Sequence, residues 1–188
     1  MKDDTGNVLT CSFWFHREEV IIHSDWNMMG MIATASHSFE VKKRRIPSDR
    51  SFIIDSRHAF LHQPIYQFPF LQFAEATLAV NSSGMAIAFL DLCTNDKAKE
   101  AAVKLNAARG SFYRIVGQSW NQLLSGDPVQ TGSLDEVSRL SRNLARIARE
   151  TVDEVYPYCG LIAADKDSAI NRVWRDLHTA SQHSLLSG

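Results

Sequence analysis

The apolar residues of this chain change their spacing near Pro69, and this change most limits the folds that its 188 residues can adopt. Before Pro69, β-branched and aromatic residues occur in short runs, which is typical of strands. After Pro69, apolar residues recur at steps of three and four over long segments, which is typical of helices. The sequence therefore predicts a mainly α chain, with a β part at residues 1–68 and a helical part at residues 69–188.

Four helices are predicted after Pro69. The first segment is apolar on almost every side, which predicts a helix that is buried on most faces. At the start of the third segment, Ser133 and Glu136 have the spacing of a capping box, and Gly160 marks a stop. Long helices joined by modest loops indicate an up-down four-helix bundle. The expected helices cover residues 69–92, 97–124, 133–160 and 168–186.

The β part has four short segments that are rich in β-branched or aromatic residues, which predicts a short antiparallel sheet. Pro47 lies between the last two segments, and proline presets φ and removes a ladder donor, so residues 46–50 are expected to form a turn. The expected strands cover residues 8–15, 19–23, 36–41 and 51–54.

Charge and composition exclude several classes of partner. The net charge is −1, so nothing draws the chain toward nucleic acid or an anionic membrane. The longest uncharged stretch, residues 76–90, is shorter than the roughly 20 residues that a membrane span needs. No metal-ligand cluster, phosphate-binding glycine loop or nucleophilic triad spacing is present. The expected partners therefore include no nucleic acid, no membrane and no metal.

The cysteines are odd in number and far apart in the sequence, at Cys11, Cys93 and Cys159. They predict neither a disulfide framework nor a zinc site, and this favours a reducing cytoplasm. The first ten residues carry acidic side chains and no apolar run, so they do not resemble a signal peptide. We therefore expect a cytoplasmic protein.

Three segments resemble the acyl-CoA dehydrogenase superfamily. Residues 26–52, WNMMGMIATASHSFEVKKRRIPSDRSF, are similar to the W-x-x-x-G-M-x-x-T-x-S-H-x-F-x-V stretch near the end of its β-domain. Residues 69–92 stand where the first bundle helix follows that domain. Residues 172–186, RVWRDLHTASQHSLL, resemble the final bundle helix and are closest to the branch that hydroxylates aromatic compounds with reduced flavin.

This resemblance implies a flavin-dependent oxidoreductase, of the monooxygenase or the acyl-CoA dehydrogenase type, that uses FAD or FMN. It assigns residues 1–68 to a partial β-domain and residues 69–188 to the C-terminal bundle. The family's N-terminal helical domain and the β-domain strands that contact the flavin have no counterpart here. The resemblance therefore implies weak or absent flavin binding by the isolated chain, and a possible separate N-terminal subunit.

The resemblance also places a catalytic histidine at His183. At 100° per residue, one polar stripe of the last helix carries Arg172, Arg175, Asp176, Thr179 and His183. In the hydroxylase branch, the matching histidine lies near the reactive edge of the flavin, and an imidazole suits this place because it can donate a hydrogen bond or pass a proton near neutral pH. The alternative is a solvated or salt-bridged helix face.

In the dehydrogenase branch, the position of Asp165 holds the glutamate that abstracts a proton from the acyl thioester. The resemblance thus gives Asp165 a catalytic role and gives Arg172, Arg175 and Ser168 roles in cofactor binding. A carboxylate that favours the helix dipole is the alternative for Asp165. The resemblance also sets Ser36 and His37 near a ligand pocket, with strand and turn structure as the alternative, whereas Met28, Met29 and Met31 are predicted to pack.

Family members pair through their bundles, and a bundle can bury only one side of a helix that is apolar all round. We therefore expect a homodimer or homotetramer that acts on a small-molecule substrate. The alternative to an enzyme is a non-catalytic helical module that dimerises or completes another subunit.

Overall fold

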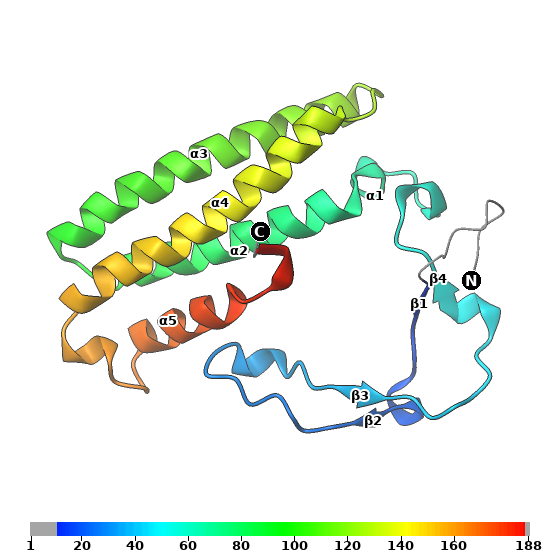
Figure 1. The fold of residues 1–188 in the computed structure, drawn as a ribbon, viewed down its shortest axis with the longest axis horizontal. Helices are drawn as coiled ribbons and strands as arrows, with labels where there is room; N and C mark the ends of the chain where they lie inside the picture. The colour runs from blue at the N-terminus through cyan, green and yellow to red at the C-terminus, as the bar shows by residue number, and fades with distance from the viewer. Residues whose placement is uncertain (1–10, 187–188) are drawn as a thin grey trace.

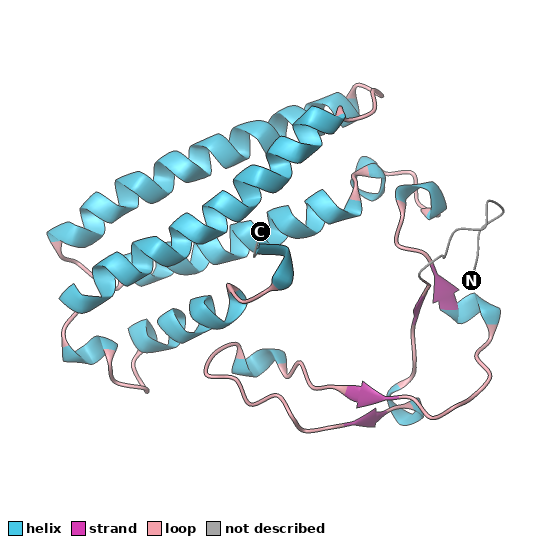
Figure 2. Ribbon diagram, in the orientation of Figure 1, coloured by secondary structure: helices cyan, strands magenta, loops and turns pink. Residues whose placement is uncertain are grey.

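The computed structural model describes residues 11–186 and is dominated by helices (Figures 1 and 2). A short helix, α1 (Pro64–Gln67), leads into four longer ones. Consecutive long helices reverse direction, and α4 packs against both α2 and α3 while α5 packs against α2. The predicted mainly α fold with a helical bundle is thus confirmed. The long helices are α2 (Phe70–Asp91), α3 (Asp96–Leu124), α4 (Thr131–Val155) and α5 (Ala169–Ala180).

The apolar stripes predicted for the bundle form its core. On α4, successive buried residues follow the steps of three and four, and on α3 the largest buried side chains are Leu105 and Phe112. Phe89 of α2 is also fully buried. Since the stripes of separate helices meet in one cluster, burial of these faces is the main source of bundle stability. The buried α4 residues in the stripe are Val137, Ser141, Leu144, Ala148, Thr151 and Val155.

Helix α2 keeps apolar residues on every side, as predicted, but only part of its surface is covered. Three large side chains near its start, Phe70, Leu71 and Phe73, are 52%, 50% and 38% exposed. By length and composition α2 is the single helix among residues 11–186 that could cross a membrane. This is weak evidence, because the core helix of a soluble protein passes the same test, and α2 packs against α3, α4 and α5.

Two predicted helix ends are wrong. Helix α4 begins at Thr131, and Gln130 precedes it without a side-chain cap. The capping box is therefore absent, and Glu136 instead binds Arg139 through two hydrogen bonds of 2.7 and 2.5 Å. At the other end, α4 stops at Val155 because Pro157 follows and has no backbone N–H to continue the helical hydrogen bonds.

The last helix is also shorter than predicted, because it ends at Ala180 and not near Leu186. Ser181 caps it, with its N–H donating to Leu177 O (2.9 Å) and its hydroxyl donating to His178 O (3.1 Å). Serine offers the backbone such local alternatives to a continuing helix. A turn at residues 181–183 and a 3₁₀ helix at Ser184–Leu186 follow, so His183 lies outside the helix.

The four strands fall inside the predicted segments but are only two residues long, and they form two separate antiparallel pairs. Of residues 11–67, only Gly30 is buried, so this part has no core of its own. The prediction that residues 1–68 are a partial β-domain stays a prediction, and residues 1–10 lie outside the described part. Strand β1 (Ser12–Phe13) pairs with β4 (Ser51–Phe52), and β2 (Ile21–Ile22) pairs with β3 (Phe39–Glu40).

The bundle contains a disulfide between Cys93 and Cys159, which corrects the expectation that no cysteines pair. The two residues are 66 positions apart in sequence, but their Cα atoms lie 5.9 Å apart because α2 ends beside the segment after α4. The spacing of the cysteines in the sequence did not indicate this pair. The two residues meet only because α4 runs along α2 and both helices end on the same side of the bundle. The link holds the start of the connection to α5 against the end of α2.

Candidate functional site

The connection between β2 and β3 contains the 26–37 loop, which is folded tightly on itself. The indole N–H of Trp26 donates to Met31 O (3.0 Å), and its backbone N–H donates to His37 Nδ1 (2.9 Å). Met31 and Ala35 adopt left-handed conformations, with φ of 55° and 44°. Non-glycine residues hold such φ values only where their surroundings enforce them, so the loop has one specified shape.

Helix α5 provides those surroundings. The backbone N–H of Met31 donates to Asp176 Oδ1 (2.5 Å), and the guanidinium of Arg175 donates to Met29 O (3.3 Å) and Lys166 O (2.9 Å). Gly30 is buried between these contacts, and a Cβ placed there would lie 2.2 Å from Arg175 O. The loop can approach α5 this closely only because residue 30 is glycine.

We expect Gly30→Ala to detach the 26–37 loop from α5, because the new methyl group would overlap helix backbone, which cannot give way as a flexible side chain could. Overpacking of this kind costs about 1–3 kcal/mol. Hydrogen exchange at the Met31 amide would report the loss. Gly84→Ala is the matched control: it lies in α2 with nothing within 4 Å of its Cβ, so protection at Met31 should be unchanged. Equal protection in both variants would contradict the close approach.

The docked loop, α2 and the end of α5 line an open cavity of about 630 Å³. Trp26, the loop methionines and Leu78 give it a mainly apolar wall, and a few polar groups interrupt that wall on the side of α5. A mainly apolar cavity with a few convergent polar groups is the usual form of a small-molecule site. The lining residues are Trp26, Met28, Met29, Met31, Thr34, Ser36, Leu78, Asn81, His178, Thr179, Ala180, Gln182 and His183.

Of the two histidines in the cavity wall, His178 is fully engaged by the protein. Its Nε2 lies 2.8 Å from Asp153 Oδ1 on α4, and its Nδ1 lies 2.8 Å from Trp174 O. Its ring also packs on the Trp174 ring, with centroids 4.2 Å apart. His178 therefore fastens α5 to α4 at the cavity wall.

His183 lies on the turn after α5, where its Nδ1 accepts a hydrogen bond from Leu185 N (3.2 Å). A neutral imidazole that accepts at Nδ1 carries its proton at Nε2, so His183 presents a donor. The residue is exposed and lines the cavity. The prediction that His183 lies on the last helix is wrong, because α5 ends at Ala180 and a short turn holds His183 instead.

Three other predicted site residues, Asp165, Ser168 and Arg172, lie at the opposite end of α5. This helix has 12 residues, so its ends are about 18 Å apart at 1.5 Å per residue. Asp165 Oδ1 accepts from Asp167 N (3.0 Å), and Ser168 caps α5 by accepting from Asn171 N (3.2 Å). Arg172 is exposed on the first turn. Neither Asp165, Ser168 nor Arg172 lines the cavity, and Arg175 holds the loop rather than facing the cavity.

The geometry also shows site residues that the sequence reasoning missed. Met28, Met29 and Met31 were predicted only to pack, yet they form the cavity wall, and Asn81 of α2 faces them. The glycine within the WNMMGM run could have indicated this site from the sequence, because a glycine among bulky residues often marks a close approach of two backbone segments. Ser36 lines the cavity, as the resemblance implied, whereas His37 is not among the lining residues and accepts a hydrogen bond from Trp26 N.

Comparison with known proteins identifies the class. Residues 91–188, more than half of the chain, match the family described as acyl-CoA dehydrogenase, C-terminal domain. The chain therefore belongs to the acyl-CoA dehydrogenase C-terminal domain family, in agreement with its helical bundle and with the resemblance of its final helix.

Particular relatives are named as monooxygenases and hydroxylases. The chain is 26% identical to an indole-3-acetate monooxygenase from Pseudomonas putida, over 90% of this chain and 49% of the relative. It is 25% identical to a pigment production hydroxylase from Rhodococcus erythropolis, over 88% of this chain and 49% of the relative. The chain thus spans about half the length of the curated relatives it matches.

Solved structures share the fold. The HsaA monooxygenase from M. tuberculosis superimposes with a TM-score of 0.86 at 21% identity, covering 95% of this chain and 53% of that one. XiaF from a Streptomyces species, solved in complex with FADH2 and glycerol, gives a TM-score of 0.82 at 16% identity, covering 98% and 54%. At these identities the likeness shows the fold, which includes the N-terminal segment as well as the bundle.

Proposed function

We propose that this chain forms the C-terminal half of the active site of a flavin-dependent monooxygenase, with FAD or FMN as cofactor and an aromatic small molecule as substrate. The observation that carries the proposal is the cavity between the 26–37 loop and α5, which is walled by apolar side chains and offers the Nε2–H of His183. The names of the relatives and the FADH2 bound to XiaF support the same class of reaction.

The residues of the cavity fit the ring end of a flavin or an aromatic substrate. Reduced flavin would supply the electrons that activate dioxygen, and such chemistry needs water to be excluded and a proton to be held in place. Trp26 and the three methionines give one side of the cavity an apolar surface, on which Met28 and Met29 are 47% and 49% exposed. His183 donates from Nε2 on the other side, and the turn after α5 keeps this proton at the cavity wall.

The cavity does not fit the phosphate end of a flavin equally well. Among the described residues, no lysine or arginine lines it, because Arg175 is turned toward the loop backbone. Charge-assisted hydrogen bonds to phosphate contribute about 1.5–3 kcal/mol each, so their absence removes a large part of flavin affinity.

We therefore expect the chain on its own to bind FMN weakly, with a dissociation constant above about 100 μM. An affinity this weak corresponds to only about 5 kcal/mol of binding free energy. Quenching of FMN fluorescence on titration with the protein measures it. Flavin that copurifies in a one-to-one ratio would contradict this expectation.

A helical module that completes another subunit is the second candidate function, and one observation favours it. Apolar side chains are exposed along the whole of residues 11–67, where only Gly30 is buried, and the start of α2 adds more. Such a surface needs a partner to cover it. The two functions differ in whether the cavity binds flavin at all, so FMN quenching that never exceeds that of a control protein would favour the second.

We also expect the protein to self-associate as a homodimer or homotetramer. An apolar groove of about 330 Å³ lies between α1, α2 and α3, beside the exposed Phe70 and Leu71. Burial of this surface is worth about 25 cal/mol for each Å² removed from water. Light scattering at micromolar concentration should give an even multiple of the 21.2 kDa chain, and a monomer at that concentration would contradict this expectation.

A further inference from the structure

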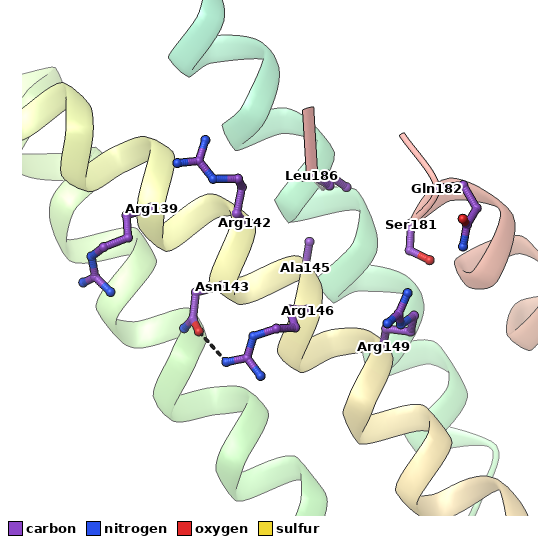
Figure 3. Close-up of a pocket in the computed structure, with 9 residues that line it drawn as sticks. All are labelled: Arg139, Arg142, Asn143, Ala145, Arg146, Arg149, Ser181, Gln182 and Leu186. Carbon is purple, nitrogen blue, oxygen red and sulfur yellow. Dashed lines mark hydrogen bonds between the residues drawn. The ribbon is translucent and has the colours of Figure 1, made fainter. Parts of the chain in front are cut away.

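A second concave surface lies between α4 and the turn after α5, and arginines dominate it (Figure 3). Arg139, Arg142, Arg146 and Arg149 follow one another at steps of three and four residues, so they share one side of α4. They line a groove of about 550 Å³ that Leu186 and the Ser181–Gln182 turn close on the other side. We call this surface the arginine groove.

No acidic side chain lines the arginine groove in the described part of the chain. Three of the arginines have acidic partners that lie outside its lining. Arg139 binds Glu136 (2.5 Å), Arg142 binds Glu75 (2.6 Å) and Arg146 binds Glu150 (2.5 Å).

These partners leave the groove ordered and positive. Glu75 is only 2% exposed and holds Arg142 from within the bundle, while Arg146 also donates to Asn143 Oδ1 (2.8 Å). Arg149 is half-buried and has no acidic partner within residues 11–186. Figure 3 shows it on the side of the groove that faces Ser181. The groove therefore retains one uncompensated positive charge among guanidinium groups that are already positioned.

The chemistry of the lining selects the kind of ligand. A guanidinium presents a planar set of N–H donors that matches phosphate and carboxylate, and a ligand with several charges can engage more than one arginine at once. Exposed ion pairs such as Arg139–Glu136 contribute little free energy. A dianion can therefore bind the arginines of such pairs in place of their glutamates with little loss of stability. The amide of Gln182 adds a neutral donor, and the groove is large enough for a small metabolite.

We propose that the arginine groove is a binding site for a small anion that carries phosphate groups, with Arg149 as its principal contact. The groove is separate from the cavity next to the 26–37 loop, although Gln182 lines both. The proposal therefore does not depend on flavin chemistry. Because a flavin phosphate and a free phosphorylated metabolite offer the same chemistry, the test below separates these two sources.

Calorimetric titration of the full chain with inorganic pyrophosphate in a low-salt buffer tests the proposal. We expect one site per chain, and we expect Arg149→Gln to raise its dissociation constant at least about tenfold, because it removes a charge-assisted contact. Arg114→Gln is the matched control: it makes the same change of charge at an exposed residue of α3 outside the groove, and it should change the constant less than about twofold. Circular dichroism confirms that both variants stay folded.

Competition identifies the source. Displacement of pyrophosphate by FMN but not by riboflavin supports a site for the flavin phosphate, and an absence of displacement by FMN supports a separate phosphorylated ligand. Equal weakening by Arg149→Gln and Arg114→Gln would overturn the proposal, because binding would then depend on net charge alone. Tighter binding of citrate than of pyrophosphate would also overturn it, in favour of carboxylates.

Discussion

Arg142→Leu should lower the free energy of unfolding by about 3 kcal/mol, because it leaves the carboxylate of Glu75 charged inside the bundle without a partner. Glu75 is 2% exposed on α2, and Arg142 Nη1 lies 2.6 Å from its Oε1. The other carboxylate oxygen, Oε2, is buried with no partner among the described residues, so the pair is already incompletely satisfied. We place the effect at the lower end of the range for a broken buried pair because Arg142 is itself 38% exposed.

Arg139→Leu is the control for this prediction. Arg139 occupies the same helix one turn earlier and binds Glu136, but both side chains are exposed, so its loss should cost less than about 1 kcal/mol. Leucine and arginine have similar helix propensities, so neither variant changes the intrinsic stability of α4 appreciably. Urea unfolding measures both. The double variant Glu75→Leu/Arg142→Leu should regain most of the lost stability, and failure to do so would show that the ion pair is not the cause.

His183→Ala should lower flavin-dependent hydroxylation by about 10²–10⁴, the usual contribution of a general acid or base, whereas Asp165→Ala should lower it less than tenfold. His183 lines the cavity, and its Nδ1 accepts from Leu185 N, which leaves Nε2 as the donor. Asp165 lies before the start of α5, about 18 Å away along a helix of 12 residues, and its carboxylate is occupied by Asp167 N. The two residues therefore cannot act on one reacting atom.

The comparison needs rates for both variants in the complete enzyme assembly, with reduced flavin and oxygen and, separately, with an acyl thioester and an electron acceptor. His183→Gln serves as the second variant: its amide still donates a hydrogen bond but cannot transfer a proton, so it distinguishes proton transfer from simple positioning. Loss of thioester oxidation in the Asp165 variant, with the His183 variant unaffected, would move the chain to the dehydrogenase branch.

The bundle could be predicted from the sequence because its information is local and periodic. Each stripe, such as the one from Val137 to Val155 on α4, repeats at the period of the helix, and the buried residues follow it closely. Helix ends were harder. The end of α5 depends on hydrogen bonds that Ser181 makes to the preceding turn, and the spacing of apolar residues does not predict such bonds.

The candidate site was only partly predictable because contacts distant in sequence create it. Asp176 was assigned to a polar stripe, but its function in the structure is to accept from Met31 N, 145 residues earlier. Cys93 and Cys159 were read as unpaired for the same reason, since only the return of α4 along α2 brings them together. The resemblance of residues 26–52 marked this segment as part of the family's β-domain but did not indicate its docking on α5.

We propose that the cavity between the 26–37 loop and α5 receives the flavin. The chain has five methionines, and three of them, Met28, Met29 and Met31, line this cavity, whereas Met85 packs against the bundle core. Methyl NMR of a methionine-labelled sample detects even millimolar binding, so it suits the weak affinity expected here. Addition of FMN should shift the three loop methyl signals and leave that of Met85 in place. If the three signals stay fixed at millimolar FMN, or if only Met85 moves, the cavity is not the flavin site.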